Sequence, residues 1–268
     1  MRVPDALLAA LLAWVGYSIL NISQAVQKIG LQRQAEGHLA VGRVLWVGAL
    51  GASGGSFAIV FAAISVGQVA VVGALAGTGL VSLALFSRLA MGEQMGWVRM
   101  LAISVTVSGA ALVALLPAAG EETTFRPLLL WLVPVVVAAM AGGAVFTVPE
   151  GPVRGLVIAG LSGFLGAWSQ LFQKLLAEDF AGVATLLSDP LTLVWFGLSF
   201  ASMVVIQFAY RFAEAIRIIP VYTALFIATP VIGGVAVFGE VLSLFQWVGV
   251  ALILGGALVL GATAAPSS

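Results

Sequence analysis

Polar side chains recur on one face of a strongly apolar segment near the start of the chain. Asn21, Gln24 and Lys28 are spaced i, i+3 and i+7, which places them on one side of an α-helix. Gln170 and Lys174 repeat part of this spacing in a second apolar segment. Amides in such a segment can bind a polar solute or join two helices, and the residues alone favour neither role. The lysines lie near segment ends, where we expect them to reach lipid headgroups.

Two further apolar segments carry glycine, proline and hydroxyl residues at corresponding places, in 73–82 and 220–230. Interrupted helices at matched positions of two halves are typical of transporter substrate sites. We therefore expect Thr78, Tyr222 and Thr223 to line a substrate site, while most of the glycines serve close packing. The expected lining is completed by one amide and two mid-segment indoles: Gln207, Trp14 and Trp168.

Glu93 and Glu240 each follow a glycine after an apolar segment. A carboxylate near the start of the next helix can cap its free N–H groups, which is the favoured interpretation. The alternative is a gate with one carboxylate on each side of a membrane. No other acidic pair is repeated, and no acid lies near the centre of an apolar segment, so the identity of any metal ligand stays unknown.

The composition excludes an ordinary soluble domain. Of 268 residues, 62% are hydrophobic and only 8% are charged, and the mean hydropathy is +1.16. The 11 basic and 11 acidic residues balance, which gives no electrostatic surface for nucleic acid. With no cysteine and one histidine, His38, the chain lacks the residues for disulfides, thiolate chemistry or a histidine-based metal site. The composition predicts a polytopic membrane protein without cofactors.

Two protease-like motifs are chance matches. The GxSG of 160–163 is followed by no histidine, and the EExxxR of 121–126 lies in a loop before Pro127. Neither has the base that the corresponding hydrolysis requires. We therefore expect no enzyme activity.

Apolar runs of about 20 residues, long enough to cross a bilayer, recur nine times. They cover about 6–28, 44–64, 68–88, 97–116, 127–148, 153–175, 191–212, 218–238 and 243–263. The fold class is thus all-α, with about nine transmembrane helices and short connections. Eight of eleven lysines and arginines fall on one side, which places the N-terminus outside and the C-terminus in the cytoplasm of an inner-membrane protein.

The chain repeats itself after about 146–147 residues. The segment 23–28 (SQAVQK) returns at 169–174 (SQLFQK), and Gly92-Glu93 returns as Gly239-Glu240. Four spans recur in order, so 1–118 forms the first repeat, 119–150 a linking span and 151–268 the second repeat. A shift of five spans inverts the second copy relative to the membrane. Inverted repeats are typical of transporters that alternate access around a central site.

The repeated motifs resemble the drug/metabolite transporter superfamily in its EamA-like form. They are Gly92-Glu93 with Gly109, and Gly239-Glu240 with Gln246, Gly249, Gly255 and Gly256. The resemblance implies ten spans in two inverted fives, of which this chain lacks the first. Three shorter matches resemble the nine-span NIPA-type magnesium transporters: Gln27-Lys28-x-Gly30-Leu31, Gly151-Pro152, and Gln207 with Pro220-x-Tyr222.

The favoured hypothesis is an alternating-access transporter for a small polar or cationic solute in the lipid bilayer. The alternatives are a NIPA-type Mg²⁺ pathway and a non-transporting scaffold subunit. Because acidic residues and histidine are missing near span centres, we expect facilitated diffusion, exchange or Na⁺ coupling rather than obligate proton antiport. The sequence leaves open the substrate, the direction of transport and whether the chain forms a homodimer.

Overall fold

The computed structural model describes residues 3–91, 96–116, 124–209, 211–213 and 215–262, and within these ranges every regular element is a helix. In chain order the elements are α1 (Val3–Ala35), α2 (Leu39–Val66), α3 (Val69–Ala74), the 3₁₀ turn η1 (Leu75–Gly77), α4 (Thr78–Met91), α5 (Trp97–Leu115), α6 (Pro127–Thr147), α7 (Pro152–Glu178), α8 (Val183–Ser188), α9 (Pro190–Ala209), α10 (Ala215–Phe238) and α11 (Leu244–Ala262). The all-helical fold class is therefore confirmed.

Eight of the helical segments are long and apolar enough to cross a membrane, and Leu244–Leu260 forms a shorter apolar helix. Their bounds follow the nine predicted runs closely, because both depend on the run length needed to span hydrocarbon. The largest difference is at the first hairpin. There α1 continues to Ala35 and α2 begins at Leu39, several residues beyond the apolar runs on each side. The six-residue α8 has no predicted counterpart.

The third apolar run is interrupted, whereas its proposed repeat partner is not. Between α3 and α4 the chain tightens into the 3₁₀ turn η1, at the glycine-rich part of the sequence. Close approach explains one of these glycines: a Cβ on Gly73 would lie 2.2 Å from Pro230 Cγ on α10. By contrast α10 runs as one helix from Ala215 to Phe238.

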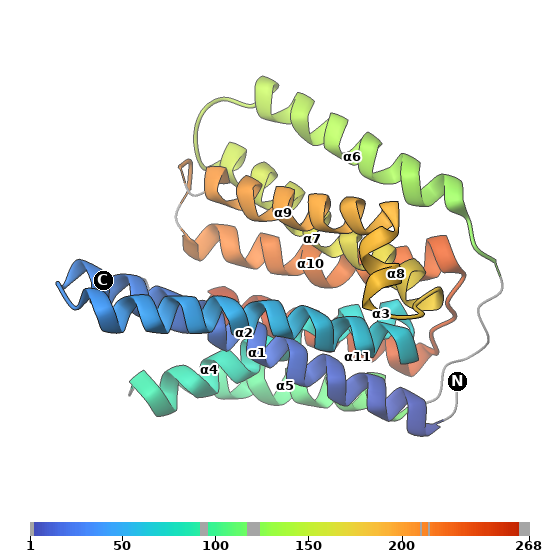
Figure 1. Ribbon diagram of the computed structural model, residues 1–268, viewed down its shortest axis with the longest axis horizontal. Coiled ribbons are helices and arrows are strands. Elements are labelled where there is room, and N and C mark those ends of the chain that lie inside the picture. The colour runs from blue at the N-terminus through green and yellow to red at the C-terminus, as the bar shows by residue number, and fades with distance from the viewer. Residues whose placement is uncertain (1–2, 92–95, 117–123, 210, 214, 263–268) are drawn as a thin grey trace.

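The helices form hairpins that pack side by side. α1 packs most extensively on α2, α7 on α9 and on α10, and α5 on α11, while α10 also lies along α3 (Figure 1). α6 lies at one edge of the bundle, against α7 and α10 (Figure 1). α7 is the most enclosed of the long helices. In its most apolar stretch 78% of the residues are buried, whereas the figure for α6 is 6%.

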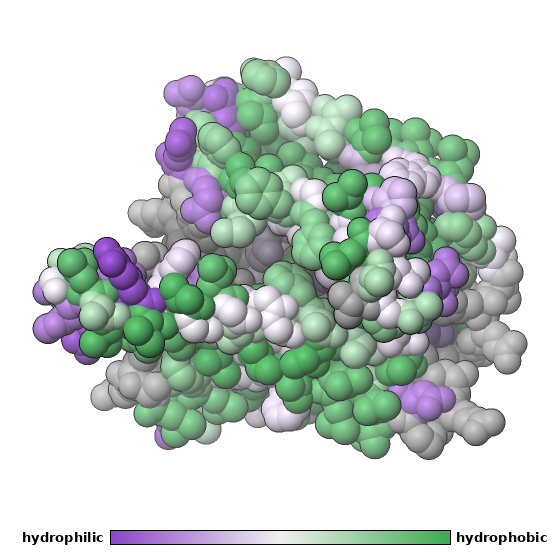
Figure 2. Space-filling view, viewed as in Figure 1, coloured by the Kyte–Doolittle hydropathy of each residue, from purple (hydrophilic) through white to green (hydrophobic). Residues whose placement is uncertain are grey.

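Apolar side chains cover most of the outer surface. Figure 2 shows hydrophobic residues over most of the visible face, with strongly hydrophilic residues toward its two ends. Large side chains such as Phe146 and Leu89 are 88% and 85% exposed. A surface this apolar is unstable in water and matches the hydrocarbon of a bilayer. The apolar helices therefore support a membrane-embedded protein.

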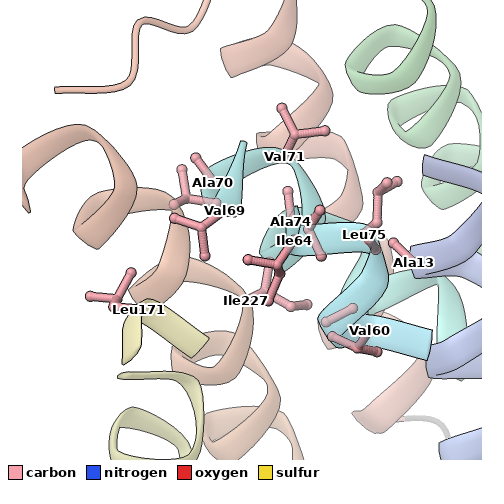
Figure 3. Packing of buried hydrophobic residues seen from close by; sticks show 14 of the residues in the cluster. Ala13, Val60, Ile64, Val69, Ala70, Val71, Ala74, Leu75, Leu171 and Ile227 are labelled. Atoms are coloured by element: carbon pink, nitrogen blue, oxygen red, sulfur yellow. The ribbon is translucent and has the colours of Figure 1, made fainter. Parts of the chain in front are cut away.

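The hydrophobic core lies around α3 and η1, which pack against helices from both halves of the chain. Val69, Val71 and Ala74 pack near Ile64 of α2 and Ile227 of α10 (Figure 3). Every residue from Val69 to Gly79 is buried. The interrupted third segment is thus the centre of the bundle, and polar groups beside it are shielded from lipid.

Candidate functional site

A hydrogen bond joins the two halves of the chain inside the bundle. Tyr17 on α1 donates its hydroxyl to Oε1 of Gln170 on α7 over 2.9 Å, and both side chains are buried. The same amide oxygen lies 3.6 Å from the Cβ position of Gly73 on α3. Three helices therefore converge on Gln170, one of the predicted substrate-binding residues.

Further polar groups lie on α1, next to Tyr17 in sequence, and on the neighbouring α4. Ser18 Oγ and Ser82 Oγ share a hydrogen bond of 2.6 Å. Asn21 donates to the Tyr17 carbonyl at 2.9 Å, and this carbonyl oxygen lies 2.7 Å from where a Cβ on Gly79 would stand. Only glycine allows α1 to approach α4 this closely. The central polar cluster is thus defined by six residues: Tyr17, Ser18, Asn21, Thr78, Ser82 and Gln170.

Thr78 lies at the point where η1 gives way to α4. Its hydroxyl donates to the Leu75 carbonyl at 2.6 Å and its side chain is buried. Ser82 Oγ donates to the Thr78 carbonyl at 3.5 Å. The predicted Thr78 therefore belongs to the cluster through Ser82, and its hydroxyl is already bonded to a carbonyl of the 3₁₀ turn.

Each half contains a serine pair between its first two long helices. Ser23 on α1 bonds Ser53 on α2 at 2.9 Å, and Ser199 on α9 donates to Ser169 on α7 at 3.1 Å. Both residues of the second pair lie 146 positions after their counterparts. In the first half Gln27 adds a bond to Ser53 Oγ at 3.0 Å. Its counterpart Gln173 is buried, and its Oε1 has no hydrogen-bond partner within the described part of the chain.

A second polar site lies where α7 and α10 end and α3 begins. Lys174 Nζ and Glu240 Oε1 form an ion pair at 2.8 Å, with side chains 5% and 0% exposed. The Glu240 carboxylate also accepts the backbone N–H groups of Val69 and Ala70, each at 2.7 Å. Lys174 Nζ lies 4.8 Å from the centre of the Phe238 ring. The expectation that Lys174 reaches headgroups is therefore wrong, because this buried partner holds it inside the protein.

Glu240 caps a helix, but not the one that follows it. Its carboxylate caps the first turn of α3, and Ala70 of that turn is 170 residues away in sequence. α11, which follows Glu240, has its own capping box. There Ser243 N–H donates to Gln246 Oε1 at 2.9 Å, and Gln246 N–H donates to Ser243 Oγ at 3.2 Å. The predicted gate or cap residue Glu93 lies outside the described residues.

The other predicted residues divide into two groups. On α10, Tyr222 stacks on Phe226 at 5.5 Å, its carbonyl lies 2.4 Å from the Cβ position of Gly163 on α7, and Thr223 is buried. Their described contacts place them at the α7–α10 crossing. The side chain of Gln24 lies outside the described part of the chain.

Three predicted lining residues face away from the cluster. Trp168 donates its ring N–H to the Leu130 carbonyl on α6 at 3.1 Å, so it joins α7 to the linking helix. Trp14 is 49% exposed and Gln207 is also exposed, which places both on the outside of the bundle. Membrane-facing tryptophan is common near bilayer interfaces, but exposure gives neither residue a role in the cluster.

Sequence reasoning missed two central side chains, Tyr17 and Ser82. Tyr17 carried a usable signal, because it precedes Asn21 by four residues and Gln24 by seven, on the face already selected. Ser82 carried only its hydroxyl within a glycine-rich segment. The Lys174–Glu240 pair was missed because each residue was judged by its distance from a span end.

No metal site is apparent in the described ranges, where no three histidine, cysteine, aspartate or glutamate side chains gather. Comparison with protein-family models, with curated proteins and with solved structures finds no match to this chain.

Proposed function

We propose that this chain is an integral membrane transporter that moves a small polar or cationic solute by alternating access between two inverted repeats. The observation that carries the proposal is the central polar cluster. Its key hydrogen bond is buried inside an apolar bundle and takes Tyr17 from one half and Gln170 from the other. Polar groups within a bilayer are costly, so they are retained chiefly where they serve function. A scaffold subunit offers no reason to place them where the halves meet.

Matched contacts in the two halves support the inverted repeat. The serine pairs Ser23–Ser53 and Ser169–Ser199 recur after 146 positions. The seam between α5 and α11 supports it independently. A Cβ on Gly109 would lie 2.6 Å from the Gly249 carbonyl, and one on Gly256 would lie 2.8 Å from the Ala102 carbonyl.

A shift of 147 positions converts Gly109 into Gly256 and Ala102 into Gly249, so it exchanges these two contacts. That exchange is what a two-fold relation between the repeats requires.

The proposal counts Leu244–Leu260 as the ninth span. It keeps the N-terminus outside and the C-terminus in the cytoplasm, because basic residues concentrate on one side of the spans.

The Mg²⁺ alternative gains no specific support. Its best candidate ligand is Glu240. This carboxylate already accepts hydrogen bonds from the Lys174 ammonium and from two backbone N–H groups. Mg²⁺ keeps several waters and needs one or two free carboxylates, which the central polar cluster does not offer. Within the cluster only hydroxyl, amide and backbone groups are available to a solute, which favours recognition by hydrogen bonds.

The test is a flux panel with purified protein in proteoliposomes, comparing Mg²⁺, amino acids and quaternary amines. We expect saturable flux of an organic solute that Gln170→Leu reduces strongly, while Ser104→Ala, which removes an exposed hydroxyl bonded within α5, leaves it unchanged. Flux of Mg²⁺ alone would favour the alternative, and no flux of any solute would favour the scaffold. An imposed pH gradient tests coupling: strict dependence on it would contradict facilitated diffusion or exchange.

A further inference from the structure

The site around Glu240 connects three segments that are distant in sequence. Its carboxylate is held by Lys174 on α7 and by the first two N–H groups of α3, while its own backbone N–H donates to the Gly234 carbonyl on α10 at 3.2 Å. We call Glu240, Lys174, Val69 and Ala70 the terminal latch. It fastens α3 from the first half onto α7 and α10 from the second.

Aromatic rings close the same end of the bundle beside the latch. Phe61, near the end of α2, lies edge-on to Phe180 after α7, with ring centres 5.4 Å apart. It also stacks on Trp195 of α9 at 6.1 Å. Ring contacts thus join the ends of α2 and α7 to the start of α9. At the same end of the bundle, the Lys174–Glu240 ion pair and the bonds of Glu240 to α3 join α3, α7 and α10.

At the opposite end, two described ion pairs each lie within one half or between it and the linking segment. Arg33 pairs with Glu36 beyond α1, and Arg154 on α7 bonds the Val148 carbonyl and the Glu150 carboxylate. α10 packs along α3 and η1 on its latch side, whereas α4 packs mainly on α1 and α11. The α4–α11 contact also joins the halves, through the cluster of Val81 and Leu260. Among the described ion pairs, however, the one that joins the two halves is Lys174–Glu240 with its bonds to α3, at the latch end.

The latch is suited to separate as a unit rather than to loosen gradually. A buried ion pair is stable only while both charges keep their partners, and removing one partner leaves an uncompensated charge. If Glu240 left α3 and Lys174, two backbone N–H groups would lose their acceptor and the Lys174 ammonium would lose its buried carboxylate in the same step. Two discrete arrangements, fastened and hydrated, follow from that requirement.

From this geometry we infer that the terminal latch is the gate at this end of the transport pathway, and that the structure represents the state in which this gate is shut. The inference rests on the proposed transport function. Opening separates Glu240 from α3 and Lys174, admits water to the α3–η1 segment and gives access to the central polar cluster from the side where α2, α7 and α10 end. By the predicted orientation this side is the outside.

A single reporter cysteine tests the gate, because the natural chain contains no cysteine. Ala74 is fully buried in α3, one turn beyond the latch (Figure 3). We would introduce Ala74→Cys and measure its reaction with a membrane-impermeant maleimide added from the latch side of proteoliposomes. With the latch intact we expect slow modification. Adding Glu240→Gln should speed it by about tenfold or more, because an amide cannot pair with Lys174 and places a donor against an N–H group.

Two further variants make the result decisive. Lys174→Met removes the ammonium but keeps both backbone bonds of Glu240, so it should accelerate modification less than Glu240→Gln. Glu150→Gln makes the same chemical change in an ion pair whose glutamate is 81% exposed at the opposite end, and should have no effect. Unchanged modification in both latch variants would overturn the gate, as would loss of folded protein in both, which would assign the latch a purely structural role.

The readout also separates this inference from the transport proposal. Solute flux without any effect of Glu240→Gln on the reporter would leave transport standing and remove the gate. A reporter response without flux of any solute would support a moving latch in a protein that is not the proposed transporter.

Discussion

The hydroxyl of Tyr17 and the amide oxygen of Gln170 meet at 2.9 Å, 153 residues apart in sequence, at the contact between the two halves. Both groups are buried, so this bond must be exchanged for another partner whenever the halves move apart. A polar solute entering between them would supply that partner. The proposed transport function therefore assigns this bond a recognition role in addition to its structural one.

Tyr17→Phe should lower both stability and transport. The substitution keeps the ring but leaves Gln170 Oε1 without its donor, at a cost of about 1–2 kcal/mol. Thermal unfolding in detergent and solute uptake measure the two effects. Ser65→Ala serves as the control, because it removes an exposed hydroxyl that bonds only the Ala62 carbonyl of its own helix. A stable variant with unchanged uptake would contradict the role of the bond.

Helix positions were predictable because bilayer thickness dictates the length of an apolar run. The interruption in the third segment was predictable too, since the glycines of 73–79 favour a break and permit close contact. Its proposed repeat partner α10 stays continuous despite Pro230, so a proline in a membrane helix does not by itself separate it into two.

The partners of the polar groups could not be predicted. Nothing in the sequence marks Val69 and Ala70 as the backbone donors for Glu240, because every non-proline residue offers the same N–H group. Lys174 lies near the end of an apolar run, a position from which lysines commonly reach headgroups. The packing of α7 against α10 buries it instead. Asn21 and Gln170 both bond Tyr17, whereas Trp14, Gln207 and Trp168 were selected by residue type and lie elsewhere.

The two serine pairs should contribute unequally to stability. Ser53 accepts Gln27 in addition to Ser23, whereas Ser199 has one described partner, Ser169. We therefore expect Ser53→Ala to cost about 1–2 kcal/mol and Ser199→Ala roughly half as much. Thermal unfolding of the two variants side by side is the measurement. Equal losses would indicate that the Gln27 bond contributes nothing.

The predicted orientation can be tested on a chain that has no cysteine of its own. His38 is exposed in the α1–α2 connection, and Ser188 is exposed at the end of the short α8, at the opposite end of the bundle. In intact cells, an impermeant maleimide should label Ser188→Cys and spare His38→Cys until the membrane is opened, because basic residues concentrate around the α1–α2 connection. The reverse pattern would invert the topology, and labelling of both in intact cells would contradict a membrane-spanning arrangement.

Glycine at the α5–α11 seam should be required at position 249 and dispensable at position 255. A Cβ on Gly249 would lie 2.7 Å from the Gly109 carbonyl, which is backbone and cannot rotate away, whereas one on Gly255 has no neighbour within 4 Å. Gly249→Ala should therefore destabilise by about 1–3 kcal/mol, and Gly255→Ala should leave stability unchanged or slightly raised. Thermal unfolding compares the same substitution at two positions of one helix. Equal stability of the variants would mean that the seam is looser than these distances require, and would weaken the two-fold relation inferred from the matched contacts of Gly109 and Gly256.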